Sequence, residues 1–201
     1  MSKTIQNRIV HDEELISRLQ RGDEWAFQLL VRRFRKKIFS IAFGITLDVE
    51  ESRDIVQDVF FQVYRSILDF RGDASLSTWL HRITVNRCLN WKRRWARRFQ
   101  WLNKSGGGTT AKTDDEPASD LPSPENRVVN AQTRQLIDRA LKKLPDQART
   151  VFVLRELEGL SYEEIAYATG IKLGTVRSRL FHARQQLRTL LQTMVGEEVE
   201  K

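Results

Sequence analysis

Residues 161–188, SYEEIAYATGIKLGTVRSRLFHARQQLR, decide the fold of the C-terminal half of the chain. Ser161, followed three residues later by Glu164, predicts a capping box at the start of a short helix. Gly170 ends that helix, and a tight connection leads into a second, longer one. The second helix carries apolar residues in steps of three and four: Leu173, Val176, Leu180, Ala183, Leu187 and Leu190.

The second helix of this stretch is also strongly basic. Between positions 172 and 188 there are five basic residues and no acidic one. A short helix, a turn with glycine and a basic second helix are typical of a helix-turn-helix motif, whose second helix lies in the major groove of duplex DNA. The alternative is a pair of helices in an ordinary bundle with a solvated basic face. We expect DNA binding.

Charge is distributed unevenly along the 201 residues. The net charge of +8 indicates a polyanionic partner. Residues 82–104 are rich in lysine and arginine and contain no acid, whereas residues 105–126 hold five acids and one lysine. Two basic helical stretches separated by an acidic spacer favour two contacts with one nucleic acid.

Several function classes are disfavoured by the residues present. Cys88 is the single cysteine, and the three histidines are far apart and lack the spacing of metal ligands. There is no glycine-rich phosphate loop or nucleophile elbow, and the carboxylates of Asp54 and Asp58 suit a helix surface better than a metal cluster. The apolar runs are too short for a membrane span, and no secretion signal is evident. We expect a cytoplasmic protein without membrane insertion, enzymatic activity, metal or cofactor.

Hydrophobic periodicity predicts an all-α chain of two helical domains joined by a flexible linker. Helices are expected over residues 12–20, 24–43, 51–68, 78–98, 125–142 and 145–158, ahead of the helix-turn-helix. Asp23 and Ser77 are the predicted N-caps of the second and fourth helices, and Pro145 is expected at the first position of another. Glycines, prolines and polar residues predict the linker at 102–125. The expected domains are 1–101 and 126–201, the second a four-helix module.

Two helical surfaces carry patterns with more than one interpretation. The third predicted helix leaves Asp54, Gln57 and Asp58 on its outer side, where they are either solvated or form a docking surface. The end of the fourth helix alternates cations with aromatic residues: Trp91, Trp95, Phe99 and Trp101. These aromatics either stack on unpaired bases or pack on the helical bundle while the arginines extend into solvent.

Five segments in a fixed order carry a family signature. They are GDEWAF at 22–27, DIVQDVFFQVY at 54–64, FRGDASLSTWLHRITVN at 70–86, LPDQARTVFVLRELEGLSYEEIA at 144–166 and GTVRSRLFHAR at 174–184. Together they resemble the extracytoplasmic-function sigma factors of bacterial RNA polymerase, of the sigma-E-like kind, over residues 12–191. A helix-turn-helix alone is weakly specific, whereas all five segments in this order around a linker are highly specific.

The resemblance implies an alternative sigma factor that binds core polymerase, recognises −35 and −10 promoter elements, melts the −10 region and directs initiation. Residues 1–101 would be sigma region 2, and residues 126–201 would be region 4. The implied partners are the largest and second-largest polymerase subunits, promoter DNA (duplex at −35, single-stranded at −10) and an anti-sigma factor that could hold the protein at the membrane. A role in stress response and nucleoid association in holoenzyme follow from the same resemblance.

The resemblance also assigns residues to each task. The polymerase-binding set is Asp54, Gln57, Asp58 and Phe61. The −10 set, which includes a pocket for a flipped base, is Phe70, Arg71, Gly72, Asp73, Ser75, Trp79, Arg82, Asn86, Arg87, Arg93 and Arg94. The −35 set is Lys172, Thr175, Arg177, Ser178, Arg179, Phe181, His182 and Arg184. In the −35 set, arginine can bond guanine and phenylalanine can contact a thymine methyl group.

Three other classes remain as alternatives. A helix-turn-helix repressor or activator would bind duplex operators as a symmetric dimer without polymerase, but it leaves residues 54–64 and 70–86 unexplained. A nuclease or recombinase would need a carboxylate metal cluster or a nucleophile in a pocket. An RNA-binding helical protein is supported only by the tryptophan- and arginine-rich helix.

His182 departs from the family pattern, in which arginine is frequent at this position. Because a neutral imidazole has fewer donors, we expect a different −35 preference that weakens as pH rises. Binding to a fixed set of −35 variants at two pH values measures this, and identical preferences at both would refute it.

Overall fold

The computed structural model describes the backbone of residues 11–104 and 135–199, and the side chains of 11–97 and 135–194. Every regular element in these ranges is a helix, which confirms the expected all-α class. The expected linker at 102–125 lies almost wholly outside the described residues, as does the start of the helix expected at 125–142. The elements are α1 (Asp12–Gln20), α2 (Glu24–Thr46), α3 (Val49–Ser66), η1 (Ile67–Asp69), α4 (Leu76–Lys104), α6 (Asp146–Phe152), η2 (Val153–Leu157), α7 (Tyr162–Thr169) and α8 (Leu173–Val199), with residues 135–143 also helical.

Aspartate side chains begin the two central helices of the N-terminal half. The Asp23 carboxylate accepts from the backbone N–H groups of Trp25 (2.9 Å) and Ala26 (3.3 Å). These are two of the orphan donors that every helix start leaves, so the predicted cap of α2 is confirmed. Asp48 accepts from Glu51 N–H at 2.9 Å and starts α3 at Val49, slightly earlier than the sequence indicates.

Two predicted helix starts are wrong by one or two residues. α4 begins at Leu76, and the hydroxyl of Ser75 accepts from the N–H of Thr78 at 3.1 Å. Ser75 therefore holds the cap position that the sequence assigned to Ser77, because either serine suits an N-cap and only the loop geometry distinguishes them. Pro145 is the N-cap of α6 rather than its first helical residue.

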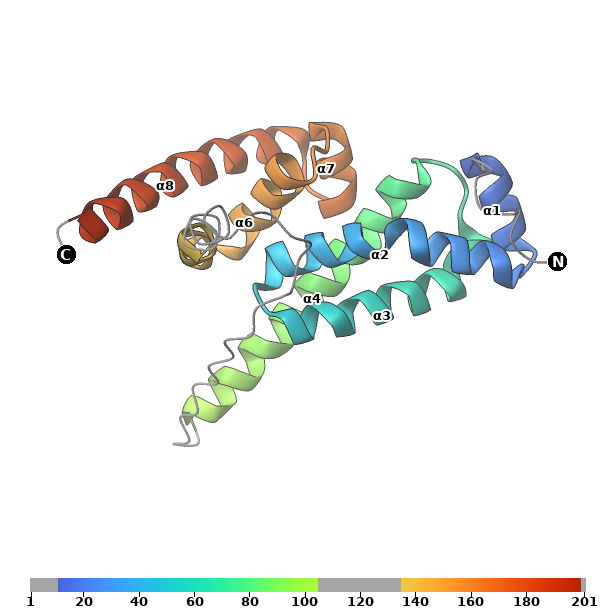
Figure 1. Cartoon of the computed structure of the whole chain (residues 1–201), viewed down its shortest axis with the longest axis horizontal. Helices are drawn as coiled ribbons and strands as arrows, with labels where there is room; N and C mark the ends of the chain where they lie inside the picture. The colour runs from blue at the N-terminus through green and yellow to red at the C-terminus, as the bar shows by residue number, and fades with distance from the viewer. Residues whose placement is uncertain (1–10, 105–134, 200–201) are drawn as a thin grey trace, which may run out of the picture.

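The described helices form two groups that share one apolar core. We name them the N-terminal module (residues 11–104) and the C-terminal module (residues 135–199). In Figure 1 the C-terminal module lies over α2 and α4, and α3 lies on their far side. Buried side chains of α6, η2, α7 and α8 belong to the same hydrophobic cluster as the buried residues of α1 to α4. The core is therefore continuous across the two modules.

The closest point of this junction is a glycine of α2. A Cβ atom on Gly44 would lie 2.7 Å from Val153 Cγ1, which is closer than Cβ atoms approach other groups in real structures. Glycine inside a helix costs about 1 kcal/mol relative to alanine, and here its missing side chain leaves space for Val153. A π-helical turn at η2 presents this valine, and Val153 is fully buried.

A second junction forms where α2 ends. Leu47 adopts a left-handed conformation (φ 57°) as the C-cap of α2, which costs roughly 1–2 kcal/mol for a residue with a side chain. This leucine packs against a cluster of the C-terminal module formed by Ala140, Leu141, Leu144, Leu187 and Met194. Apolar burial between the modules offsets the backbone strain.

No helix in the described part of the chain is both long and apolar enough to cross a bilayer.

His81 supplies a test of this packing, because it is almost fully buried on α4 and its Nδ1 atom has no partner. The pKa of His81 is lowered from 6.5 to about 4: burial lowers it most, Lys37 of α2 also lowers it, and Glu164 of α7 acts in the opposite direction. The folded chain thus disfavours the charged ring. This contribution to stability is complete above pH 6.5 and is lost as the pH falls towards 4, by up to about 1.4 kcal/mol per pH unit.

We expect His81→Leu to flatten the fall in the free energy of unfolding between pH 6.5 and 4, measured by urea denaturation. The matched control is His182→Leu, whose ring is exposed on α8. An unchanged pH dependence in His81→Leu would contradict the account.

Candidate nucleic-acid interface

The loop between η1 and α4 forms a small polar cavity. Its volume is about 250 Å³, and its lining is Asp69, Phe70, Arg71, Gly72, Asp73, Trp79 and Tyr167. Gly72 has a φ of 79°, a left-handed conformation that glycine adopts without strain. The rings of Phe70 and Trp79 lie 5.1 Å apart between centroids, and Gln20 donates to the carbonyl of Phe70 at 3.2 Å. The loop is therefore held in place from α1 and α4.

Most of the predicted −10 residues surround this cavity or follow it along α4. Arg71, Gly72, Asp73, Arg82 and Asn86 are exposed, and Trp79 is half-buried. The guanidinium of Arg82 lies over the ring of Tyr167 at 4.9 Å. The hydroxyl of Ser75 caps α4, so this residue has a structural task in addition to the predicted one.

Arg87 connects the predicted −10 set to the predicted polymerase-binding set. Its guanidinium donates to the amide oxygen of Gln62 on α3 at 2.7 Å and lies 3.9 Å from the carboxylate of Asp58. An arginine between two helices can orient both surfaces, but it leaves fewer donors for phosphate.

The basic end of α4 points into solvent. Arg93, Arg94 and Arg97 are exposed, and Arg93 also donates to Asn90 at 2.8 Å. Trp91 packs against the core, whereas Trp95 is 53% exposed. The two interpretations of this segment thus apply to different residues. Packing explains Trp91, whereas about half of Trp95 is exposed to solvent, and the side chains of Phe99 and Trp101 lie outside the described residues.

The outer face of α3 combines carboxylates with exposed apolar side chains. Asp54, Gln57 and Asp58 are exposed, as predicted, and so is Phe61. The same face continues through Tyr64 and Leu68, which are 65% and 69% exposed. Neither residue was predicted, although the spacing 54, 57, 58, 61, 64 places five residues on one stripe of α3, and Leu68 follows in η1. Single exposed apolar residues are ordinary, but Phe61 and Tyr64 on α3, continued by Leu68 on η1, indicate a binding surface.

The helix-turn-helix has the predicted local structure. The Ser161 hydroxyl accepts from Glu164 N–H at 3.1 Å, and the Glu164 carboxylate accepts from Ser161 N–H at 2.8 Å, so the capping box is present. The hydrogen bond from the backbone N–H of Ser161 is the main reason that the pKa of Glu164 is lowered from its usual value of 4.5. Gly170 ends α7 with a φ of 70°. The buried positions Val176, Leu180 and Ala183 then direct the opposite face of α8 to solvent.

The predicted −35 residues gather on this outer face of α8. Phe181 is 57% exposed and contacts His182 edge-on, with ring centroids 5.5 Å apart. The Ser178 hydroxyl donates to the carbonyl of Thr175 at 3.2 Å. Lys172, Arg177 and Arg184 are also exposed, and Thr175 and Arg179 are half-buried.

Arg184 is held by a neighbour that the sequence analysis did not consider. It donates to the Glu156 carboxylate of η2 at 3.0 and 2.5 Å, and this hydrogen bond raises its pKa further. Two N–H groups on one carboxylate fix the guanidinium plane, so Arg184 is oriented before any DNA arrives.

Two family models match the chain, one to each module. "Sigma-70 region 2" matches residues 30–98, and "Sigma-70, region 4" matches residues 134–187. The RNA polymerase sigma-H factor of Pseudomonas aeruginosa is 36% identical over 186 residues, covering 92% of this chain and 96% of that protein. The ECF RNA polymerase sigma-E factor of Escherichia coli K12 is 35% identical over 192 residues, with the same coverage. The chain is an extracytoplasmic-function sigma factor.

Solved structures share the fold of this sigma factor. The complex of CnrH with the cytosolic domain of CnrY gives a TM-score of 0.65 at 24% identity, covering 90% of this chain and 97% of that one. The sigma factor RpoE with the anti-sigma factor NepR from Bartonella quintana gives 0.66 at 23% identity, covering 83% and 96%.

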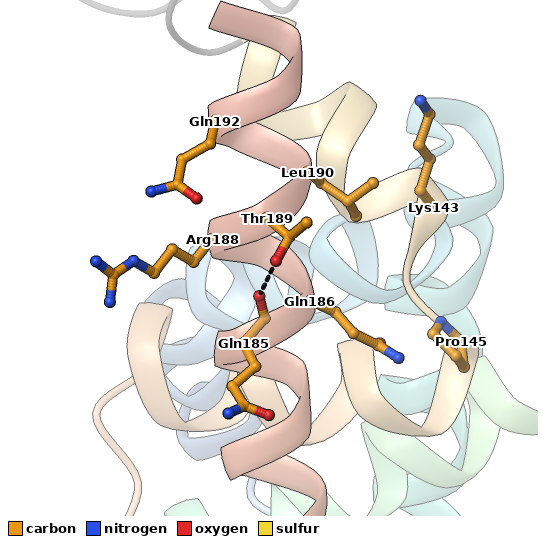
Figure 2. A pocket seen from close by; sticks show the side chains of 8 residues that line it. All are labelled: Lys143, Pro145, Gln185, Gln186, Arg188, Thr189, Leu190 and Gln192. Carbon is orange, nitrogen blue, oxygen red and sulfur yellow. Dashed lines mark hydrogen bonds between the residues drawn. The ribbon is translucent and has the colours of Figure 1, made fainter.

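A wider groove of about 790 Å³ lies on the C-terminal half of α8 (Figure 2). Lys143 and Pro145 line one side of it, and the other lining residues come from α8: Gln185, Gln186, Arg188, Thr189, Leu190 and Gln192. None of the predicted site residues line this groove. Among the described residues, no group of three or more His, Cys, Asp or Glu side chains could hold a metal ion.

Proposed function

We propose that this sigma factor divides its work among three surfaces: the outer face of α3 for core polymerase, the loop at 70–73 with α4 for the −10 element, and the outer face of α8 for the −35 element. As a member of the family, the protein directs transcription initiation by bacterial RNA polymerase. We assign region 2 to residues 1–101, region 4 to residues 126–201 and the linker to residues 102–125.

The α3 face suits a protein partner better than DNA. It carries the carboxylates of Asp54 and Asp58, which would repel phosphates, next to exposed apolar side chains of Phe61, Tyr64 and Leu68. Apolar anchors inside a polar rim are the usual anatomy of a protein interface. We assign this face to the largest polymerase subunit, and contacts with the second-largest subunit to region 4.

The loop at 70–73 suits an unpaired base. It combines an aromatic pair, Phe70 and Trp79, with charged and backbone groups at the cavity wall. In such a pocket a base can stack on the rings and form hydrogen bonds along its edge. These contacts offset the free energy that is needed to remove the base from the DNA stack. The exposed cations Arg93, Arg94 and Arg97 follow along α4 at the position where the adjacent backbone would run.

The outer face of α8 suits the major groove. Arg177 and Phe181 present a guanidinium and a ring to base edges, and Lys172 and Thr175 suit phosphate contacts. Arg184, oriented by Glu156, suits a fixed phosphate or base position. We include His182 and Ser178 in this surface.

Regulation, location and chemistry follow from the same proposal. Because the structurally similar RpoE is held by an anti-sigma factor, we propose an anti-sigma partner for this chain, which could keep it at the membrane until a stress signal arrives. The protein acts in the cytoplasm, where polymerase and promoters lie, and has no enzymatic activity of its own, because the polymerase performs the phosphoryl transfer.

The observation that supports the proposal is that the residues predicted for each task lie close together: on the outer face of α3, around the 70–73 loop and along α4, and at the start of α8. The test is transcription by core polymerase, with and without this protein, over a library of randomised promoters. We expect initiation at a subset that shares two spaced elements. If core polymerase is never redirected while the free protein protects duplex DNA in a footprint, a helix-turn-helix repressor explains the chain better.

The α3 face gives a sharper prediction. We expect Phe61→Ala to weaken binding of core polymerase at least about tenfold, because a large apolar anchor at an interface is often worth more than 1 kcal/mol. Fluorescence anisotropy of the labelled full chain against core polymerase measures this binding.

Leu157→Ala is the matched control, since Leu157 is 55% exposed but lies on η2. Both side chains are exposed, so neither variant should change the free energy of unfolding by more than about 0.5 kcal/mol. Wild-type affinity in Phe61→Ala would remove the α3 face from the polymerase interface.

A further inference from the structure

A glutamine at the end of α1 holds the backbone from which the 70–73 loop starts. The Nε2 atom of Gln20 donates to the carbonyl oxygen of Ile67 at 3.3 Å and to that of Phe70 at 3.2 Å. Ile67 is the first residue of η1, and Phe70 is its C-cap. A side-chain amide has two N–H donors, so one glutamine can serve both carbonyls. The two ends of a short segment are thus joined to a residue about 50 positions earlier in the chain.

Phe70 is the point at which the chain leaves the core and enters the wall of the cavity. Ile67 is buried, whereas residues 71–73 are exposed. Between them Phe70 adopts an extended conformation (φ −69°, ψ 114°), and its ring lies 5.1 Å from that of Trp79. The orientation of the Phe70 peptide therefore determines both the place of this ring and the direction in which the loop continues.

The loop has few other anchors. Among the described residues, hydrogen bonds reach the backbone of residues 70–73 only at Phe70: its N–H donates to Ile67 at 3.2 Å, and its carbonyl accepts from Gln20. Gly72, two residues later, is a glycine in the left-handed region, and glycine restricts the backbone less than any other residue. The geometry of the loop therefore depends strongly on the hydrogen bond from Gln20.

The corner between α1 and α2 keeps Gln20 in its place. Leu19 is buried in the core, and its carbonyl accepts from the N–H of Gly22 at 3.0 Å. The N–H of Asp23 donates to the carbonyl of Arg18 at 3.1 Å, and the Asp23 carboxylate lies 3.5 Å from the Arg18 guanidinium. The last turn of α1 is thus tied to the cap of α2, so the side chain of Gln20 extends from a fixed backbone.

We propose that Gln20 is a positioning residue for −10 recognition, which fixes the Phe70 peptide and thereby the loop that reads the unpaired base. This inference rests on the proposed function of the 70–73 loop. Gln20 acts through Phe70 and not through contact with DNA. The −10 residues predicted from the sequence include none from α1, and the region 2 model matches only residues 30–98. The site for the unpaired base therefore begins earlier in the chain than either indicates.

This role predicts a loss of selectivity rather than a general loss of binding. Stacking of a base on an aromatic ring tolerates any sequence, because every base has a π face. Discrimination between bases depends instead on hydrogen bonds along the base edge, which weaken steeply when donor and acceptor are misaligned. A loop released from Gln20 can still stack a base at Phe70 and Trp79, but it distinguishes the four bases less well.

Four variants of the full chain separate the hydrogen bond from charge and from size. Gln20→Glu keeps the shape, but an ionised carboxylate has no donor for the two carbonyls. Gln20→Leu removes the donors without adding charge. Gln20→Lys restores donors on a side chain of similar reach and should rescue selectivity. Ser17→Glu is the matched control, because it places the same charge in the last turn of α1 at an exposed position.

The measurement is transcription by core polymerase with each variant, on promoters with a fixed −35 element and a randomised −10 element. For each −10 position it gives the ratio of initiation between the best and the worst base. We expect Gln20→Glu and Gln20→Leu to lower the largest ratio at least about fivefold, while Gln20→Lys and Ser17→Glu keep it.

Two results would overturn the inference. Wild-type ratios in Gln20→Glu and Gln20→Leu, including a uniform fall of initiation on all promoters, would show that Gln20 serves stability alone and would leave the proposed function intact. The absence of any −10 preference in the wild type would refute the proposed function of the loop, and with it the role of Gln20.

Discussion

The fit of Val153 against Gly44 is the constraint on which the arrangement of the two modules depends. Gly44 lies in the last turns of α2, the helix that contacts α1, α3 and α4. A side chain at position 44 would overlap Val153 of η2, so one of the two would have to shift. The continuous apolar core, the buried His81 and the shielded ion pair of Lys92 all require that η2 and α7 lie where they do.

The two faces of α7 pack against different parts of the molecule. One face carries Ile165 and Ala168 into the shared core and supports the recognition helix α8. Tyr167 and Glu164 face α4, where they contact Arg82 and Thr78. The helix that supports α8 therefore also contacts α4, the helix to which we assign −10 recognition.

The features that could be predicted from the sequence are those that depend on residues close to one another along the chain. The capping box of Ser161 and Glu164, the cap at Asp23 and the turn at Gly170 depend on residues within a few positions of each other, and the structure confirms each. The choice between Ser75 and Ser77 failed because both serines satisfy the same local rule. The left-handed Leu47 and the π-helical turn at η2 were also missed, since long-range packing stabilises them and no local pattern indicates them.

The candidate surfaces were predictable where one helical face carries them, as on α3 and α8. Tyr64 was not predicted as part of the α3 surface; its ring contacts Phe27 edge-on, yet most of it is exposed. The contact of α7 with the −10 surface joins residues more than 80 positions apart, for example Thr78 and Glu164. Neither periodicity nor family motifs indicate such a pair, because both describe each module separately.

The most direct measurement of the central claim is the distance between the modules in solution. Spin labels at Ser40→Cys on α2 and Gln192→Cys on α8 occupy exposed positions outside all three proposed surfaces. Double electron–electron resonance should give one short, narrow distribution for the free chain and a longer one when core polymerase and promoter DNA are present. A broad, long distribution for the free chain would contradict the shared core of the two modules.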